Sequence, residues 1–133
     1  LADRSLIEPM LNKTRDSYNL DLISQLVAEA AIADQDYVRG NWQKVIIERN
    51  RLKAQLHELG ILCADSQANF LLATIPESIN SSAADLYQKL KEKHILVRYF
   101  NADRLDDKLR ISVGTREENN QLLSTLREIL NQS

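Results

Sequence analysis

The sequence predicts an α+β fold, in which a small, mainly antiparallel sheet has helices packed on one face and is preceded by a long helix. The longest amphipathic pattern, at 42–59, is helical. Short β-type segments and helical patterns then follow in the order β-β-α-β-β-α. Only three Gly and two Pro occur in 133 residues, which is too few for an all-β protein rich in tight turns.

The first 40 residues are predicted to be helical. Residues 3–13 carry apolar side chains at helical spacing, and 14–19 have no period. A second helix is expected over about 21–39, with Asp21 before its first turn and Gly40 as its C-terminal cap. Its apolar face is rich in small residues, and comprises Leu22, Leu26, Ala30 and Ala33. A boundary between two parts of the chain is therefore expected near residue 40.

The helix at 42–59 has the strongest pattern, and Gly60 is expected to end it in a left-handed conformation. Its stripe consists of Trp42, Val45, Ile46, Arg49, Leu52, Leu56 and Leu59. Each of the later β-type segments is followed by a turn, a helix or Pro76. They lie at 61–64, 69–75, 95–100 and 109–113.

Two further helices complete the predicted fold. One runs over about 82–93, with Ser81 or Ser82 as its N-cap. The last begins at 116, where Thr115 and Glu118 have the spacing of a capping box. We expect both helices to pack on the same face of the sheet as the helix at 42–59.

Charge and hydropathy exclude several classes of partner. Lys and Arg total 17 against 19 Asp and Glu, so the net charge is −2, with no electrostatic signature for nucleic acid or an anionic membrane. No apolar run is long enough to cross a bilayer, and no signal-peptide pattern opens the sequence. A single Cys63 excludes an intramolecular disulfide. We expect a cytoplasmic protein and, because the chain starts at Leu1 rather than Met, a piece of a longer one.

Few residues have the spacing of a metal or nucleophile site. His57 and His94 have no nearby carboxylate cluster, so we interpret both as surface histidines and expect no metal. Cys63 lies in an apolar segment, which favours a core role over a catalytic thiolate. The three glycines are scattered singly and cannot form a phosphate-binding loop.

Two arginines lie within otherwise apolar strands, Arg98 in ILVRYF and Arg110 in LRISV. A guanidinium on a face closed to solvent needs an anionic partner, and its fork matches a carboxylate or phosphate. The alternative is that both point to solvent from an edge strand or pair with an internal Asp. The pattern alone leaves both interpretations open.

The segment LRISVGTREEN at 109–119 resembles the C-terminal motif of the histidinol-phosphate aminotransferases, class II members of the fold-type I pyridoxal-phosphate enzymes. The resemblance extends along essentially the whole chain. LADRSLIEPMLNKTRDSYNLDLISQ at 1–25 resembles the segment that runs into the family's Pro-Tyr-Asn element. SQANFLL at 66–72 and HILVRYF at 94–100 resemble two strands of its small domain.

The resemblance implies roles for individual residues. Arg110 matches the arginine that binds the substrate α-carboxylate, and Arg98 matches one that supports binding of the phosphorylated ligand. Tyr18 and Asn19 fall in an element near the active site and the dimer interface, although Ser17 stands where the family usually has Pro. No residue here is expected to be catalytic or cofactor-binding, because the family's Schiff-base lysine would lie before residue 1.

By this resemblance, the intact chain moves an amino group between histidinol phosphate and 2-oxoglutarate in histidine biosynthesis. It would use pyridoxal phosphate and form a homodimer. Residues 1–40 would be the end of the large domain with inter-domain helices, and 41–133 the C-terminal small α+β domain. The chain by itself is expected to bind no cofactor and to be inactive.

Two other functions remain open. One is another fold-type I enzyme, such as a threonine-phosphate decarboxylase or an aromatic aminotransferase, since both also bind a carboxylate. The other is a non-catalytic α+β module that binds a ligand or dimerises. The residues that would separate these alternatives are not in this sequence.

Overall fold

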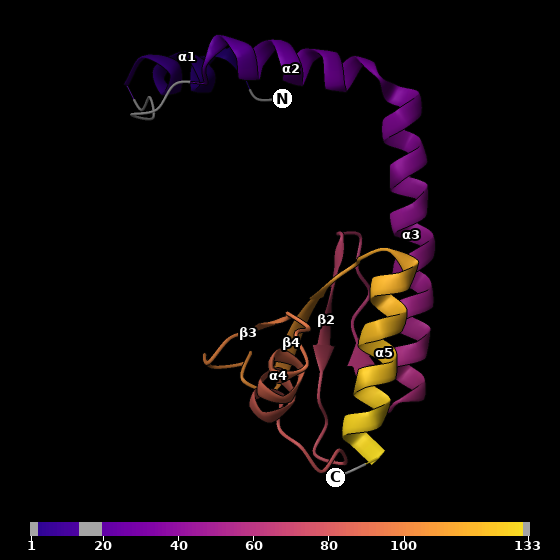
Figure 1. Cartoon of the computed structure of the whole chain (residues 1–133). Helices are drawn as coiled ribbons and strands as arrows, with labels where there is room; N and C mark the ends of the chain where they lie inside the picture. Colours follow the sequence, from indigo (N-terminus) through magenta and orange to yellow (C-terminus); the bar gives the residue numbers. More distant parts are fainter. Residues whose placement is uncertain (1–2, 14–19, 132–133) are drawn as a thin grey trace. The chain divides into compact units, whose positions relative to one another are not determined.

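The computed structural model describes residues 3–13 and 20–131, with the side chains of 11–13 excepted. The chain divides into two compact units, Leu1–Val38 and Arg39–Ser133. The elements are drawn in Figure 1. In the described residues they are α1 (Arg4–Lys13), α2 (Leu22–Ala33), α3 (Gln35–Glu58), β1 (Leu62–Cys63), β2 (Phe70–Thr74), α4 (Ala83–Glu92), β3 (Arg98–Tyr99), β4 (Lys108–Ser112) and α5 (Arg116–Asn131).

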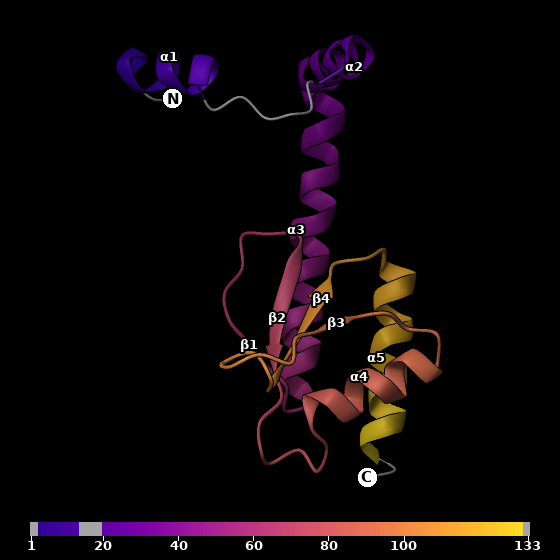
Figure 2. The ribbon, with the colours of Figure 1, turned by 90° about the vertical axis from the view of Figure 1, so that its left-hand side faces the viewer.

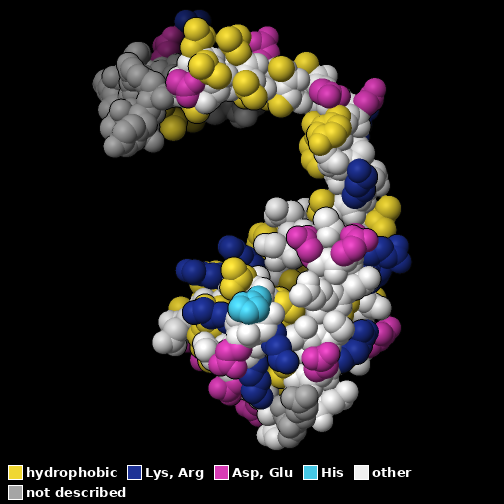
Figure 3. All heavy atoms as spheres, in the orientation of Figure 1, with side chains coloured by type: hydrophobic (Ala, Val, Ile, Leu, Met, Phe, Trp, Pro, Cys, Tyr) yellow, Lys and Arg dark blue, Asp and Glu magenta, His cyan; other side chains and the backbone are white. Residues whose placement is uncertain are grey.

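The first unit contains α1 and α2. Asp21 caps α2 as predicted, because its carboxylate accepts a hydrogen bond from the Ser24 N–H at 2.9 Å. No described residue of α2 is buried, and its hydrophobic side chains reach the surface along the helix (Figure 3). Leu22 is 70% and Leu26 57% exposed, so the predicted apolar face is present without a covering element among the described residues.

The boundary between α2 and α3 differs from the prediction. α2 ends at Ala33 rather than at about 39, and Gly40 lies inside α3 instead of capping α2. Asp34 explains the break, because it is the C-cap of α2 and its carboxylate also accepts from the Tyr37 N–H at the start of α3. Gly40 has no heavy atom near the position of a Cβ, so it marks no close approach.

The C-terminal end of α3 confirms the predicted role of Gly60. Its φ is +78°, and the helix closes with hydrogen bonds from the Gly60 N–H to the His57 carbonyl and from the Ile61 N–H to the Leu56 carbonyl, both at 3.0 Å. These two bonds define a Schellman motif. Trp42 was expected on the apolar stripe but is 58% exposed, since the buried part of α3 begins only at Arg49.

The sheet of the second unit has the strand order β1-β2-β4-β3 (Figure 2). Every neighbouring pair is antiparallel. The prediction of a small antiparallel sheet is therefore confirmed. The flanking strands are shorter than expected, because only Leu62–Cys63 and Arg98–Tyr99 make ladder hydrogen bonds. β2 and β4 are the central pair, with Leu72 opposite Arg110.

One face of the sheet carries the core. Leu71, Ala73, Leu109 and Ile111 are buried, whereas their neighbours along β2 and β4 are half-buried or exposed. The buried hydrophobic residues of α3, α4 and α5 belong to the same cluster, so all three helices cover this face as predicted. The other face of β2, β4 and β3 remains open in the second unit.

The N-terminal caps predicted for α4 and α5 are present. Ser82 and Asp85 form a capping box at α4, and Thr115 and Glu118 do the same at α5. In the ranges that the structure describes, no helix is long and apolar enough to span a membrane.

Candidate functional site

The two strand arginines lie side by side on the open face of the sheet. Arg98 on β3 is directly opposite Arg110 on β4 in the antiparallel register. Both side chains are exposed, whereas Leu109 and Ile111, the neighbours of Arg110 in β4, are in the core. The alternation of β4 therefore explains why its arginine points away from the helices.

Aromatic rings lie against both guanidiniums. The Arg110 guanidinium carbon is 5.6 Å from the centre of the Phe70 ring and 5.8 Å from that of Phe100. The Arg98 guanidinium carbon is 5.3 Å from the centre of the same Phe100 ring. These distances are within the range of cation–π attraction. Three strand segments, around β2, β3 and β4, thus contribute to one cationic and aromatic patch.

Neither guanidinium pairs with an acidic side chain of the described residues. The ion pairs found among the described residues involve other cations, and no hydrogen bond joins Arg98 or Arg110 to a carboxylate there. Among the described residues, both arginines therefore have the solvent-facing orientation, and no Asp described there pairs with either of them. Like charges directly opposite each other destabilise a strand pair. An anion bound between the two would remove this repulsion and match the guanidinium forks.

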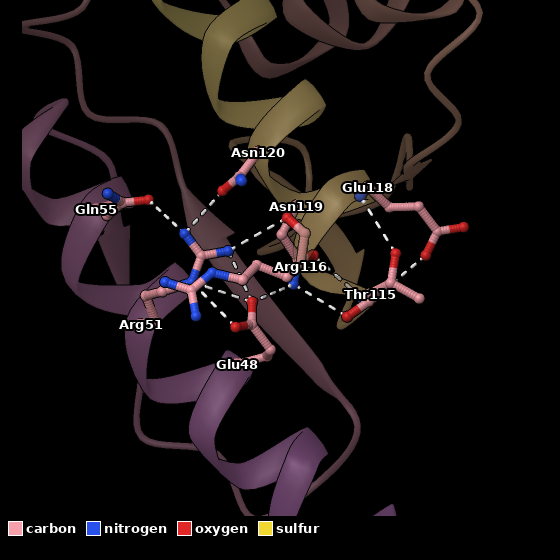
Figure 4. A network of polar contacts seen from close by, with 9 residues as sticks. Glu48, Arg51, Gln55, Thr115, Arg116, Glu118, Asn119 and Asn120 are labelled. Carbon is pink, nitrogen blue, oxygen red and sulfur yellow. Dashed lines mark hydrogen bonds and ion pairs between the residues drawn. The ribbon is translucent and has the colours of Figure 1, made fainter.

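The turn after β4 is held by the side chain of Asn119, which is 2% exposed. Its Oδ1 accepts from the Gly114 N–H at 3.1 Å, and its Nδ2 donates to the Gly114 carbonyl at 3.0 Å. The same Nδ2 donates to Glu48 Oε2 on α3 at 3.1 Å (Figure 4). The amide therefore fixes the end of β4 against two helices.

Gly114 itself approaches the first turn of α5 closely. A Cβ at this position would be 2.6 Å from Glu118 Oε2 and 3.1 Å from the Glu118 Cβ. Glu118 Oε2 also accepts from the Thr115 N–H at 2.7 Å in the capping box. A larger side chain here would displace the capping carboxylate.

An ion pair on α3 completes this support. Arg51 donates to Glu48 Oε2 at 2.7 Å and to Asn120 Oδ1 on α5 at 2.9 Å (Figure 4). The hydrogen bond from Arg51 is the main reason that the pKa of the Glu48 carboxyl is lowered, and the Asn119 amide adds to it. α3 is thereby joined to the first turn of α5 by charged and amide groups.

The loop before β2 is held by Arg49, which is 8% exposed. Its Nη1 donates to the Ala68 carbonyl at 2.8 Å, and the Ser66 hydroxyl donates to the Phe70 carbonyl at 2.7 Å. Sequence reasoning placed Arg49 on the buried stripe of the helix but gave it no role. The signal in the sequence was a charged residue on an otherwise apolar helix face, because a buried charge needs a polar partner.

The other residues that the sequence analysis singled out are not described as part of this cationic and aromatic patch. Tyr18 and Asn19 lie outside the described residues. Cys63 is buried, as expected. His94 is exposed, and His57 accepts a hydrogen bond from the Cys63 N–H at 3.0 Å, so it links α3 to β1. Among the described residues, no group of three or more His, Cys, Asp or Glu is placed to bind a metal.

The described lysines do not form a pyridoxal phosphate site. Lys53 pairs with Asp65 and Lys108 with Asp107, whereas the others with described side chains are exposed. A lysine that forms an imine needs a desolvated or otherwise activated amine, and none of these has such surroundings. Among the described residues, the adjacent guanidiniums of Arg98 and Arg110 are the arrangement whose geometry suits an anion.

The chain is similar in sequence to known aminotransferases. The family model for aminotransferase class I and II matches residues 3–126. Histidinol-phosphate aminotransferase of Microcystis aeruginosa is 49% identical over 129 residues, which cover 97% of this chain and 36% of that protein. The chain thus spans little more than a third of the length of this relative.

Solved structures show the same fold. The histidinol-phosphate aminotransferase of Clostridium acetobutylicum has a TM-score of 0.86 at 22% identity, over 98% of this chain and 39% of that one. The enzyme of Sinorhizobium meliloti, crystallised with pyridoxal-5'-phosphate, has a TM-score of 0.79 at 26% identity, over 93% of this chain and 34% of that one.

Proposed function

The chain belongs to the class I and II aminotransferases, and from this premise we propose that it is the C-terminal part of a histidinol-phosphate aminotransferase. The intact protein would transfer an amino group between histidinol phosphate and 2-oxoglutarate in histidine biosynthesis. The high identity to a histidinol-phosphate aminotransferase supports this choice. So does the pair of arginines, because the two substrates carry a phosphate and carboxylates.

The main structural support for the proposal is that the guanidiniums of Arg98 and Arg110 are adjacent. Arg110 would bind the carboxylate of the amino-acid substrate through two parallel N–H···O bonds, and Arg98 would bind the phosphorylated end of the other substrate. A carboxylate held by two hydrogen bonds has a fixed orientation. This orientation also fixes the direction of the reacting bond on the neighbouring carbon. Binding and orientation are thus the contributions of this chain.

The open face of the sheet supports a further part of the proposal. Both guanidiniums are exposed, so a substrate bound to them alone would remain in water. We propose that residues 41–133 form a small domain whose open face is covered by a large domain, of which 1–40 is the end. The uncovered apolar face of α2 favours contacts with further parts of the protein, including a second subunit of a cytoplasmic homodimer. Tyr18 and Asn19 would lie near this active site.

Pyridoxal phosphate would be the cofactor of the intact protein, where it supplies an electron sink for amino-group transfer. The described lysines do not fit it, and we propose that the residues that hold it lie in the large domain. We therefore expect the chain alone to be inactive. A lysine-bound cofactor absorbance band on adding pyridoxal phosphate to the chain alone would contradict this part of the proposal.

The test is transamination by the intact protein. Purified with pyridoxal phosphate, it should form glutamate from 2-oxoglutarate when histidinol phosphate is the donor, and the Arg110→Ala variant serves as the control. Release of carbon dioxide from threonine phosphate would instead identify a decarboxylase. Transamination only with aromatic amino acids would identify an aromatic aminotransferase.

A further inference from the structure

Phe100 is the one ring in the described residues that touches both strand arginines. We propose that it is a positioning residue, which holds the guanidiniums of Arg98 and Arg110 together so that they bind a dianion as a unit. The inference rests on the proposed function, since it concerns the same anion-binding face. It adds the reason why two like charges stay adjacent in the absence of a ligand.

The backbone provides little restraint for Arg98. Its strand β3 has only two residues and lies at the edge of the sheet, with β4 as its one partner. Arg110 is in the middle of the longer strand β4, which pairs on both sides. Without another contact, repulsion would drive the Arg98 side chain away from Arg110 into solvent.

The Phe100 ring opposes that repulsion. The negative face of an aromatic ring attracts a cation, and here one ring lies 5.3 Å from one guanidinium carbon and 5.8 Å from the other. The ring is itself restrained, because it is half-buried and the Phe100 carbonyl accepts from the Ala102 N–H at 3.0 Å. Attraction to a shared ring therefore keeps both charges in one place.

Phe70 provides a matched comparison. Its ring contacts Arg110 at 5.6 Å, and no contact of this ring with Arg98 is found in the described residues. It is anchored in β2 opposite Ser112. If Phe100 joins the two guanidiniums, its removal should weaken the binding of dianions more than that of monoanions, whereas removal of Phe70 should affect both through Arg110 alone.

The first measurement needs no ligand. In NMR spectra of the 133-residue chain, a ring close to a guanidinium shifts the Nε–H signal of that arginine. Phe100→Leu should remove the ring-induced shift from Arg98 and reduce it at Arg110, and Phe100→Tyr should retain both. Phe70→Leu should change only Arg110. An Arg98 signal that is the same in Phe100→Leu as in the wild type would overturn the inference.

The second measurement compares two anions on the same samples. Methyl phosphate is largely a dianion at about pH 7.5, and acetate is a monoanion. Phe100→Leu should lower the affinity for methyl phosphate by about two- to five-fold for each lost contact, with a smaller effect on acetate. Phe100→Tyr should restore the ratio of the two affinities. An equal loss for both anions would point to a merely structural role and would overturn the inference.

These measurements distinguish a failure of the proposed anion binding from a failure of the proposed role of Phe100. If the wild-type chain binds neither anion, and Arg110→Ala gives the same result, the anion-binding part of the proposed function is wrong, while the NMR shifts still decide whether Phe100 positions the arginines. If the wild type binds methyl phosphate and Arg110→Ala abolishes binding, but Phe100→Leu changes nothing, only the inference about Phe100 is wrong.

Discussion

Asn119 and Gly114 exchange two hydrogen bonds, with the side-chain amide of one pairing with the backbone N–H and carbonyl of the other. The amide thus takes the place of a neighbouring strand at the point where β4 ends. Its third hydrogen bond, to Glu48, joins this turn to α3. The position of Arg110, four residues before Gly114, depends on this turn because β4 runs directly into it.

Replacing Asn119 with Ala should destabilise the second unit. The Gly114 N–H and carbonyl would lose their partner, and an unsatisfied buried polar group costs about 1–3 kcal/mol. Urea denaturation should show a lower midpoint with an unchanged slope. A midpoint equal to that of the wild type would mean that water replaces the amide at no cost.

A second variant, Asn119→Asp, tests the effect of charge at this position. It keeps an acceptor for the Gly114 N–H but brings a second carboxylate against Glu48. Like charges raise the pKa values of both carboxyls in the folded state, so the variant should gain stability relative to the wild type as the pH is lowered from neutral. Asn119→Ala should show a smaller gain, which comes only from the loss of the amide hydrogen bond that helps to lower the pKa of Glu48. A pH dependence of equal size in both variants would exclude charge repulsion as the cause.

Arg110→Ala should affect substrate binding and leave stability nearly unchanged. A hydrogen bond to a charged group contributes about 1.5–3 kcal/mol, so kcat/KM of the intact enzyme should fall by at least about tenfold to a hundredfold. Arg110→Lys should recover only part of this loss, because an ammonium lacks the planar fork. The kinetics of the three proteins would be compared at saturating cofactor.

Stability is the control for Arg110, because its side chain is exposed and lies opposite Arg98. Removal of one of two adjacent like charges should leave the free energy of unfolding within about 0.5 kcal/mol of the wild type. A large loss of stability with normal kinetics would show that the residue is structural and would remove the basis for its assigned role.

The stability of the second unit should depend on Glu48 in acid. The Arg51 hydrogen bond lowers the pKa of this carboxyl in the folded state, so its contribution is present above the unfolded Glu pKa of about 4.3. It is lost as the pH falls through the lower folded value. Glu48→Gln should therefore be less stable than the wild type at neutral pH, and the difference should shrink below about pH 4 in urea titrations. A difference that does not change with pH would show that the charge of Glu48 is unimportant.

Much of the fold of the second unit could be predicted from local pattern. Gly60, Ser82 and Thr115 mark helix ends in ways that depend on a few neighbouring residues, and each prediction is confirmed. The break at Asp34 was missed because Asp can end one helix and begin the next, whereas Gly40 looked like the stronger signal. A helix tolerates an exposed glycine at a cost of about 1 kcal/mol.

The candidate site was harder to predict. Arg98 and Arg110 could be singled out as charges inside apolar strands, but their register depends on pairing across a loop. The roles of Asn119 and Glu48 follow from a contact between α3 and α5, which lie far apart in the sequence. Nothing in the local spacing of either residue indicates that contact.

Cys63 should react slowly with alkylating reagents. Burial raises the pKa of its thiol from 9.0 to about 11, so at about pH 8 the thiolate fraction is lower by a factor on the order of a hundred. Mass spectrometry after brief exposure to iodoacetamide should find little modification of the folded chain and full modification in urea. Rapid alkylation without denaturant would show that β1 opens readily.

His94→Gly should stabilise the chain. His94 has a φ of 61° at the end of α4, where its N–H donates to the Lys91 carbonyl and the next residue, Ile95, donates to the Leu90 carbonyl. This is the left-handed position of a Schellman motif, which glycine adopts without the steric cost that a Cβ brings. Part of the gain is offset because glycine also increases the entropy of the unfolded chain. We expect a net gain of about 0.5–1 kcal/mol in urea denaturation, and none for His94→Ala, which keeps the Cβ. An equal gain from Ala would show that the imidazole itself, rather than the backbone conformation, is unfavourable at this position.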